Sequence, residues 1–385
     1  MSGISFMEKL LDGIEVEWTV LGNERFIEIS NSGRKPVKAS MRAAGETPYY
    51  GANNIQDYVE GHTHDGEFVL VAEDGSASVE SYSIQYATGK FWANNHVHVV
   101  RGRAELNTRF LYHYLCIVNF IPFLSGGGRA KLTKGKLIDI PVPIPCPDNP
   151  QKSLEIQTEI VRILDTFTEL TAELTAELTA ELTARKKQYN YYRDQLLSFD
   201  EGEVEWKPLE EVALVGTGHH DTQDAIEDGD YIFYARGRAP LRLDVFDFDE
   251  TAIITAGDGA GVGKVFHYAQ GKYALHQRAY RIVPNEVMEP RFVYHYVTAN
   301  FYEYIQKASV SSSVTSLRRP MFLNFQIPVP MLSEQKRIVA ILDKFDTLTN
   351  SITEGLPCEI ELRQKQCEYY RDLLLSFPKP DGAAV

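Results

Sequence analysis

Two stretches of the chain combine glycine, hydroxyl and cationic side chains, the groups that bind phosphate oxygens. The first spans residues 125–136 and supplies Gly126, Gly127, Gly128, Arg129, Lys131, Thr133, Lys134 and Lys136. The second spans residues 309–319 and supplies Ser311, Ser312, Ser313, Thr315, Arg318 and Arg319. Glycine lets a backbone approach closely, hydroxyl and N–H groups bind phosphate, and Lys and Arg supply charge. We expect both stretches to be loops that contact a nucleic acid.

The position of these stretches strengthens that expectation. Each one lies just before an Ile-Pro-Val-Pro element, at residues 140–143 and 327–330. A solvated loop without a ligand explains either stretch taken alone, whereas recurrence at an equivalent place favours binding. Arg236 and Arg238 are weaker candidates, because arginine reads base edges but also serves turns.

Sites for other chemistry are not expected. The pairs His62/His64 and His96/His98 have strand-like spacing but no Cys or carboxylate cluster beside them, which disfavours a metal site. The sequence also lacks a methyltransferase motif, a nucleophile elbow and a helicase motif set. No catalytic residue and no bound cofactor are therefore expected in this chain.

Residues 257–264 resemble a phosphate-binding loop but depart from it in detail. Asp258 occupies the first glycine position of the motif, and Val265 replaces the required Ser or Thr. The residues that follow have strand character, whereas a phosphate loop opens a helix. We therefore expect a glycine-rich hairpin here.

The chain contains an internal repeat that spans most of its length. Glu-Val-Glu-Trp occurs at 15–18 and 203–206, and Arg-Phe-x-Tyr-His-Tyr occurs at 109–114 and 291–296. Tyr-Tyr-Arg-Asp-x-Leu-Leu-Ser-Phe occurs at 191–199 and 369–377. The longer block at residues 160–199 recurs at 338–377 with an offset of 178 residues at both of its ends, whereas the offsets elsewhere range from 182 to 188. Equal length in an otherwise variable repeat is typical of a structural spacer.

Two helical blocks should form that spacer. Residues 154–199 contain no Gly or Pro, and Thr-Ala-Glu-Leu recurs there at 171–174, 175–178 and 179–182. In the second block, Gly355-Leu356-Pro357 should separate a helix over 334–353 from one over 357–376. Helices of this length need a partner for their apolar stripe, so an antiparallel coiled coil is preferred to two separate surface helices. The expected pairing and docking residues are Leu164, Phe167, Leu174, Leu178, Leu182, Tyr192, Leu196, Leu342, Phe345, Tyr370 and Leu374.

The sequence thus predicts an α/β (α+β) fold with a pseudo-two-fold, circular layout. We expect an N-terminal recognition domain at 1–150, a first spacer helix at 151–202, a C-terminal recognition domain at 203–332 and a second spacer block at 333–385. Short strands are expected at 67–72, 81–86 and 251–256, and aromatic helices at 110–120 and 292–305. The aromatic repeat more readily packs a helix than stacks bases.

Charge and cysteine content limit the function classes. The 385 residues include 39 Lys and Arg against 53 Asp and Glu, a net charge of −14 that is unusual for a nucleic-acid binder. Half of that excess lies in residues 154–205, with 12 acids and 5 bases, so it does not exclude a basic surface elsewhere. Four scattered cysteines and no apolar run of 18 residues predict a cytoplasmic protein outside the membrane.

With the repeat, the Thr-Ala-Glu-Leu array and the paired IVxILD and YYRDxLLSF blocks, the chain resembles specificity subunits of type I restriction-modification enzymes. The array and residues 185–197 resemble the IC branch of that family. The resemblance implies two target-recognition domains that read a split, asymmetric double-stranded DNA site, with helices that set the gap.

The resemblance also implies partners. Two methyltransferase subunits would carry S-adenosylmethionine, and two restriction subunits with motor and nuclease activity would use ATP and Mg²⁺ in phage defence. The competing hypothesis is a two-domain protein-binding scaffold without a DNA role.

Overall fold

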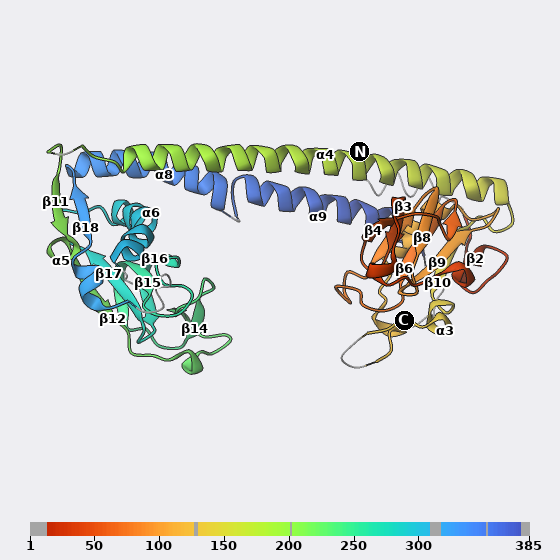
Figure 1. Ribbon diagram of the computed structural model, residues 1–385, viewed down its shortest axis with the longest axis horizontal. Helices are drawn as coiled ribbons and strands as arrows, with labels where there is room; N and C mark the ends of the chain where they lie inside the picture. The colour runs from red at the N-terminus through yellow and green to blue at the C-terminus, as the bar shows by residue number, and fades with distance from the viewer. Residues whose placement is uncertain (1–13, 127–129, 201, 309–316, 352, 379–385) are drawn as a thin grey trace. The chain divides into compact units, whose positions relative to one another are not determined.

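The computed structural model describes residues 14–126, 130–200, 202–308, 317–351 and 353–378. These residues fall into two compact units (Figure 1). Unit 1 combines Met1–Ala176 with Glu361–Val385, and unit 2 is Glu177–Ile360. Unit 1 is thus assembled from both ends of the chain, whereas unit 2 is continuous.

The strands of unit 1 form, among its described residues, two four-stranded sheets and one ribbon. The first sheet has the order β2 (Ile27–Ile29), β9 (Val97–Gly102), β6 (Phe68–Ala72) and β7 (Ile84–Ala87), with all pairs antiparallel. The second has the order β4 (Ile55–Val59), β3 (Ala44–Tyr50), β8 (Lys90–Ala93) and β5 (His64–Asp65), with β3 and β8 parallel. The ribbon pairs β1 (Val16–Val20) with β10 (Pro141–Pro145).

The strand expected at 67–72 is β6, one of the two inner strands of the first sheet. All five residues of β6 are buried, which explains its uninterrupted apolar sequence Phe-Val-Leu-Val-Ala. The strand expected at 81–86 is β7, which begins later, at Ile84.

The single-turn 3-10 helices of both units are η1 (Asn31–Gly33), η2 (Ala39–Met41), η3 (Ile121–Phe123) and η4 (Thr222–Asp224).

Helix α2 (Thr108–Leu115) packs on the first sheet of unit 1, against β6, β7 and β9. The Asn107 side chain caps it by accepting from the backbone N–H groups of Arg109 and Phe110. Phe110 and Leu115 are fully buried, so the aromatic repeat packs a helix as expected. The expectation that this helix extends to residue 120 is wrong, since it ends at Leu115. β-Branched residues and a proline follow, and they disfavour further helix.

Unit 2 repeats this plan with one larger sheet. Its order is β12 (Ala213–Thr217), β17 (Ala279–Pro284), β15 (Phe248–Ala256), β16 (Phe266–Leu275), β13 (Tyr231–Tyr234) and β14 (Leu241–Leu243). The ribbon pairs β11 (Glu205–Pro208) with β18 (Gln326–Val329), and the short helix α5 (Leu209–Val212) follows β11. Trp206 lies opposite Pro328 in this ribbon, as Trp18 lies opposite Pro143 in unit 1.

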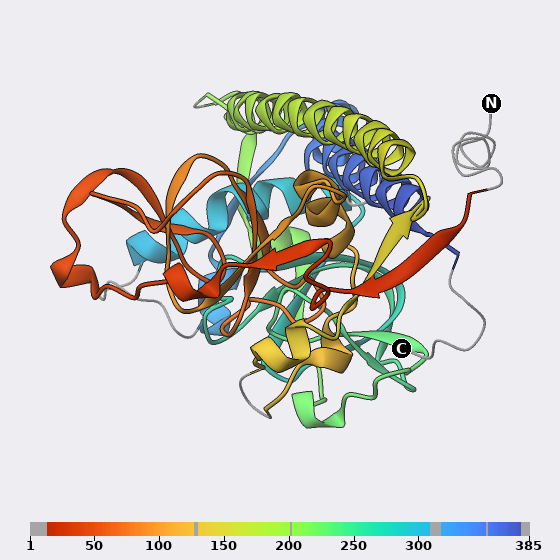
Figure 2. The same cartoon turned by 90° about the vertical axis from the view of Figure 1, so that its right-hand side faces the viewer.

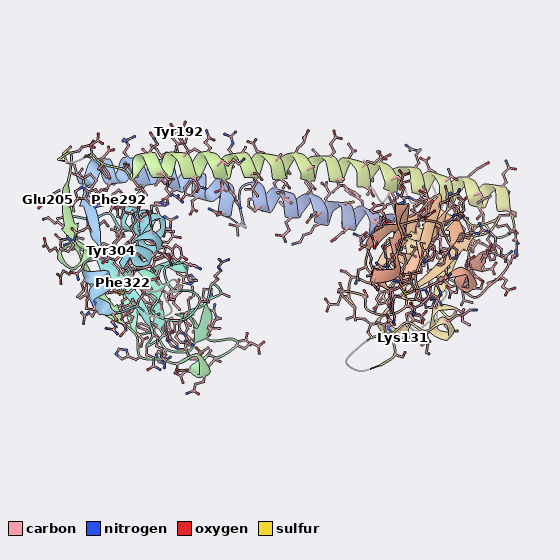
Figure 3. The ribbon with its side chains drawn as sticks, in the orientation of Figure 1. Lys131, Tyr192, Glu205, Phe292, Tyr304 and Phe322 are labelled. Carbon is pink, nitrogen blue, oxygen red and sulfur yellow. The ribbon has the colours of Figure 1, made fainter. Side chains whose placement is uncertain are left out.

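Aromatic side chains fill the core of unit 2. Phe292 and Phe301 of α6 (Pro290–Ala308) are at most 1% exposed, and so is Phe322 of α7 (Arg319–Leu323). The Phe301 and Phe322 rings stack with centroids 4.8 Å apart. Figure 3 labels Phe292, Tyr304 and Phe322 within this unit. Helix α6 extends the predicted helix by two residues before Phe292 and three after Ile305.

The first spacer block is the single helix α4 (Pro150–Leu196). The helix expected from residue 151 begins one residue earlier, at Pro150, because proline's missing N–H and fixed φ suit a first turn. Residues 150–176 of α4 belong to unit 1 and residues 177–196 to unit 2. All three Thr-Ala-Glu-Leu repeats lie within this uninterrupted helix.

The second spacer block is broken where expected. Helix α8 (Leu332–Asn350) and helix α9 (Leu356–Leu375) flank the break. Gly355 has φ +82°, and a Cβ there would lie 2.6 Å from the Thr347 carbonyl oxygen. Glycine is therefore required at this turn. Pro357 falls in the first turn of α9, where it removes no helical hydrogen bond.

Each unit pairs one stretch of α4 with one of these helices. In unit 1, Phe167 stacks on Tyr370 of α9 with centroids 5.3 Å apart and planes 7° apart. Earlier α4 residues, such as Leu164, pack with later α9 residues, such as Leu374, so the two run antiparallel (Figures 1 and 2). In unit 2, Tyr192 stacks on Phe345 of α8 in the same way, at 5.8 Å.

Candidate nucleic-acid interface in each unit

The first predicted stretch, residues 125–136, is hydrogen-bonded to the turn that follows β6 in unit 1. The backbones of Ser125 and Lys131 exchange two hydrogen bonds of 2.9 Å, which closes the loop between them. The Leu132 N–H then donates to the Glu73 carbonyl at 2.7 Å, directly after β6. Gly126 is exposed with φ +93°. Gly127, Gly128 and Arg129 lie outside the described residues.

Lys131 shares an ion-pair cluster at the base of this loop. Its Nζ lies 3.1 Å from Glu73 Oε1, and Arg34 donates to the other carboxylate oxygen at 2.6 Å. Burial alone would raise the pKa of Glu73, but the hydrogen bonds from Arg34 and Lys131 outweigh it and hold that pKa below its ordinary value. The Lys131 side chain is 46% exposed and is labelled in Figure 3. Its charge is thus partly balanced within the protein.

The rest of this stretch is not a loop. Residues Lys134–Leu137 form the short helix α3, which corrects the sequence expectation. Thr133 caps α3, because its Oγ1 accepts from the Lys136 N–H, so this hydroxyl already has a local role. Lys134 and Lys136 are both exposed on α3. Among the described cations of the first stretch, they differ from Lys131, which shares Glu73.

The neighbouring turn after β6 is held by polar side chains. Asn53 donates to the Gly75 carbonyl at 2.8 Å and accepts from the Ala77 N–H at 2.8 Å. His96 Nδ1 lies 2.6 Å from Asp74 Oδ1 beside it. These contacts hold the turn, and its Asp74 pairs with Lys131 in an isolated antiparallel bridge.

The second predicted stretch returns to the equivalent turn of unit 2. The Leu317 N–H donates to the Gly257 carbonyl at 2.8 Å, directly after β15. This turn joins antiparallel β15 and β16, which confirms the glycine-rich hairpin. Arg318 precedes α7 and is exposed, whereas Arg319 begins α7 and donates to the Val215 carbonyl at 3.2 Å. Arg319 thus corrects the expectation of a loop through residue 319. Ser311, Ser312, Ser313 and Thr315 lie outside the described residues.

Two arginines meet one carboxylate at this hairpin. Arg236 Nη1 lies 2.9 Å from one oxygen of Asp258, and Arg278 Nη1 lies 3.1 Å from the other. Burial alone would raise the pKa of Asp258, but these two hydrogen bonds hold it below its ordinary value. The side chains of Arg236 and Arg278 remain 40% and 61% exposed, and Arg238 is exposed nearby. The pair therefore presents more cationic than anionic charge.

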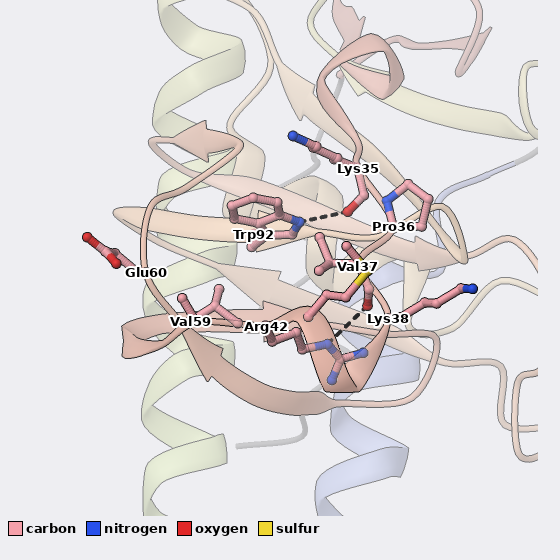
Figure 4. A pocket seen from close by; sticks show the side chains of 10 residues that line it. Lys35, Pro36, Val37, Lys38, Arg42, Val59, Glu60 and Trp92 are labelled. Carbon is pink, nitrogen blue, oxygen red and sulfur yellow. Dashed lines mark hydrogen bonds between the residues drawn. The ribbon is translucent and has the colours of Figure 1, made fainter.

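A cationic arch in unit 1, residues 34–43, was missed by the sequence reasoning. The Trp92 indole donates to the Lys35 carbonyl at 2.7 Å, and Arg42 Nε donates to the Val37 carbonyl at 3.1 Å (Figure 4). These residues border an open pocket of about 510 Å³ that Lys38 also lines. The available signal was charge, since residues 34–42 carry four bases and no acid.

The expected spacer residues divide into a buried, a half-buried and an exposed group. Leu164, Leu342 and Leu374 are at most 5% exposed. Phe167, Leu178, Leu182, Leu196, Phe345 and Tyr370 are half-buried. Leu174 is 42% exposed and Tyr192 41%, and Figure 3 labels Tyr192 on α4. The exposed group leaves apolar surface uncovered on α4.

Other kinds of site are not found in the described part of the chain. It contains no group of three His, Cys, Asp or Glu side chains arranged to hold a metal ion. None of its helices is long and apolar enough to cross a membrane. His98, one of these histidines, is fully buried; its Nε2 donates to the Leu132 carbonyl and its Nδ1 accepts from Asn31 Nδ2.

Comparison with known proteins gives consistent matches. A family model described as "Type I restriction modification DNA specificity domain" matches residues 15–184 and 201–362. A type I restriction enzyme specificity subunit of Haemophilus influenzae is 48% identical over 97% of this chain and 98% of its own length. The EcoR124I/EcoR124II specificity subunit of Escherichia coli is 38% identical over 99% of both chains.

Solved structures share the fold at low sequence identity. The S subunit of a type I restriction-modification system from M. genitalium matches with a TM-score of 0.53 and 15% identity, covering 96% of this chain and 98% of that one. A chain from a study of type I restriction-modification complex assembly matches with a TM-score of 0.58 and 15% identity, covering 94% and 97%.

Proposed function

Because this chain belongs to the specificity subunits of type I restriction-modification enzymes, we propose that each of its units reads one half of a bipartite DNA target. Members of this family are the non-catalytic subunits that recognise the DNA sequence. The proposal concerns how this chain divides that task between its units and which surfaces perform it.

One observation carries the proposal. In each unit a stretch with exposed cations returns by a backbone hydrogen bond to the turn after a central strand, at Glu73 in unit 1 and Gly257 in unit 2. Exposed Lys134 and Lys136 follow Leu132 in unit 1, and Arg236 and Arg278 pair with Asp258 of the turn in unit 2. Cations of this kind contact phosphates, and arginine also reads guanine in the major groove.

The two units should read different bases. Their turns carry different side chains, with His96 beside Asp74 in unit 1 and two arginines beside Asp258 in unit 2. The cationic arch with Lys35 and Lys38 belongs to unit 1, and we assign it to phosphate contact there. Unlike readers on one chain imply an asymmetric target, with α4, α8 and α9 setting the gap between its halves.

Partners complete the activity. We propose that two methyltransferase subunits, with S-adenosylmethionine, and two restriction subunits, with ATP and Mg²⁺, assemble on this chain in the cytoplasm. The exposed apolar side chains of α4 and α9 suit such docking, and Tyr191 and Tyr369 are 60% and 62% exposed at equivalent places in the repeat. Docking residues that recur in both units fit two copies of the same partner.

The acidic net charge is compatible with this role. Residues 154–205 carry 12 acids and 5 bases, whereas residues 20–150 carry 13 of each. Half of the excess acid therefore lies in residues 154–205, which begin in the first spacer helix and are separate in sequence from the cationic turns. A protein-binding scaffold without a DNA role is disfavoured by membership of the family.

Duplex binding by the assembled methyltransferase complex tests the proposal. We expect binding to one bipartite sequence, with an affinity that falls steeply as salt rises. Adenine methylation mapped across a host genome should then give two fixed half-sites at a constant gap. Binding that ignores sequence and salt would contradict the proposal and support the scaffold.

A further inference from the structure

A carboxylate of the spacer helix α4 is hydrogen-bonded to the recognition part of unit 1, by which we mean its sheets together with α2. Asp165 of α4 accepts from Arg109 Nε at 2.9 Å and from His113 Nε2 at 2.8 Å, both on α2. The imidazole of His113 is 5% exposed. The Arg109 guanidinium also lies 4.4 Å from the ring centroid of Tyr86 in β7. One side chain of α4 is thereby tied to both a helix and a sheet.

Unit 2 contains the same arrangement. Asp343 of α8 accepts from Arg291 Nε and from His295 Nε2, each at 2.7 Å. The Arg291 guanidinium lies 5.1 Å from the ring centroid of Tyr268 in β16. Unit 2 adds a second carboxylate, since Arg291 Nη2 donates to Asp346 at 2.8 Å.

A buried glutamine makes a second fixed point in each unit. Gln157 Oε1 accepts from the Asn107 N–H at 2.8 Å, and Gln335 Oε1 accepts from the Glu289 N–H at 2.7 Å. These two amides precede α2 and α6 in sequence. Both glutamine side chains are fully buried, and their Nε2 groups also donate to backbone carbonyls. We call the Asp and Gln contacts of each unit its clamp.

Each clamp fixes the orientation of a recognition part on its spacer helix. Asp165 and Gln157 lie eight residues apart on α4, so they hold α2 at points about 12 Å apart along the spacer. Apolar packing permits small rotations, whereas hydrogen bonds weaken steeply away from linearity. Two such points prevent the recognition part from rocking on its helix.

Rocking matters because neighbouring target spacings differ little. One additional base pair moves a half-site by about 3.4 Å and turns it by about 34°. A reader that could tilt by a comparable amount would accept a gap that is one base pair too short or too long. Rejection of such sites requires the reader to be held in one orientation.

We propose that the two clamps are positioning devices that confer selectivity for the length of the gap between half-sites. The proposal rests on the proposed function, since it assigns gap selectivity to Asp165, Asp343 and their partners. It separates two kinds of specificity in one molecule, because bases are read at the cationic turns and the gap is read through the clamps.

The test uses the full chain in complex with its methyltransferase. DNA substrates keep the half-sites mapped for the wild type and vary the gap from two base pairs shorter to two longer. Asp165→Asn and Asp343→Asn remove the charge without changing side-chain size. Glu159→Gln and Glu334→Gln are the matched controls, because they remove one charge each from exposed pairs with Arg162 and Arg337 on the same helices.

We expect wild-type and control complexes to methylate one gap length at least about tenfold faster than its neighbours. In the Asp165→Asn complex that ratio should fall by about tenfold, the factor expected for one hydrogen bond to a charged group. The penalty for base changes within either half-site should stay unchanged. Both variants should lower the ratio, and Asp343→Asn should lower it less, because Arg291 keeps its hydrogen bond to Asp346 in unit 2.

A merely structural role predicts a different result. The overall methylation rate or the melting temperature would then fall while the ratio between gap lengths stayed at the wild-type value, and this outcome overturns the proposal. If Asp165→Asn fails to assemble, Asp343→Asn and the charge-conserving Arg109→Lys, which removes the Nε hydrogen bond to Asp165, decide by the same ratio. A wild-type complex without any sequence-specific methylation would instead refute the proposed function.

Discussion

Lys131 and Lys134 lie three residues apart in one stretch, yet their amines have different surroundings. Lys131 shares Glu73 with Arg34, whereas Lys134 is exposed on α3 beside Lys136. An amine that already has an intramolecular carboxylate gains less from a phosphate, since the existing pair must be given up. These contacts therefore rank the cationic candidates for DNA binding, which the sequence alone could not do.

We predict a larger loss of DNA affinity from Lys134→Ala/Lys136→Ala than from Lys131→Ala in the assembled complex. Each lost phosphate contact should reduce the slope of log affinity against log salt by about 1, so the double variant should lose about 2. Gel-shift titration at several salt concentrations measures both quantities. Equal slopes for wild type and double variant would remove α3 from the interface.

Buried histidines make the stability of the fold depend on pH. Burial lowers the pKa of His98, His113 and His295, so the folded protein resists protonation that the unfolded chain accepts. Stability from these groups is complete above the ordinary histidine pKa of about 6.5 and is lost as pH falls through the lowered folded values.

We therefore predict that the melting temperature falls between pH 7.5 and pH 5. His113→Gln should weaken that dependence, because it removes one of the groups responsible. His62→Gln is the control, since His62 is exposed. Differential scanning calorimetry across this pH range gives the comparison, and a flat profile for the wild type would exclude the assigned linkage.

Residue-level contacts were only partly predictable. The clamp residues Arg109 and Asp165 are 56 positions apart, and no local pattern links them. The available signal was their duplication, because both members recur at Arg291 and Asp343 with offsets of 182 and 178. By contrast, burial of the aromatic repeat followed from its helical spacing, which is a local property.

At the scale of elements, long helices were predictable and short ones were not. Helix α4 lacks Gly and Pro for 46 residues after Pro150, so composition alone indicates it. Helices α3 and α7 span four and five residues, too few to show a period. They depend on the Thr133 cap and on burial of Phe322, which tertiary structure supplies. The parallel pairing of β3 with β8 also depends on tertiary structure and was not predicted from the sequence.

The Thr-Ala-Glu-Leu array yields a prediction at this scale. Deletion of residues 175–178 shortens α4 by about 6 Å, which equals at most about 1.8 base pairs. Tilt and repacking of the paired helix should reduce the effect, so we expect the gap to change by about one base pair. Mapping of methylated adenines reports the gap and the bases together. An unchanged gap at full activity would show that the array does not set it.

At the scale of the whole molecule, the chain should be inert by itself. We predict that the purified chain neither transfers methyl groups from S-adenosylmethionine nor cleaves DNA, because its family is non-catalytic. Radiolabel transfer and plasmid cleavage assays measure this, and added methyltransferase partner is the positive control. Methyl transfer in the absence of the partner would contradict this division of labour.

The division of unit 1 between both ends of the chain affects how the protein folds during synthesis. Residues 177–360 form a continuous unit, but α9 and the Pro378 carbonyl that receives the Trp18 indole come last. At about 5–20 residues per second, some 200 residues of translation leave unit 1 incomplete for roughly 10–40 s. During that time Ile156, Ile160 and Leu164 lack the α9 residues that bury them. A nascent chain stalled in this interval would present an apolar surface to chaperones and proteases.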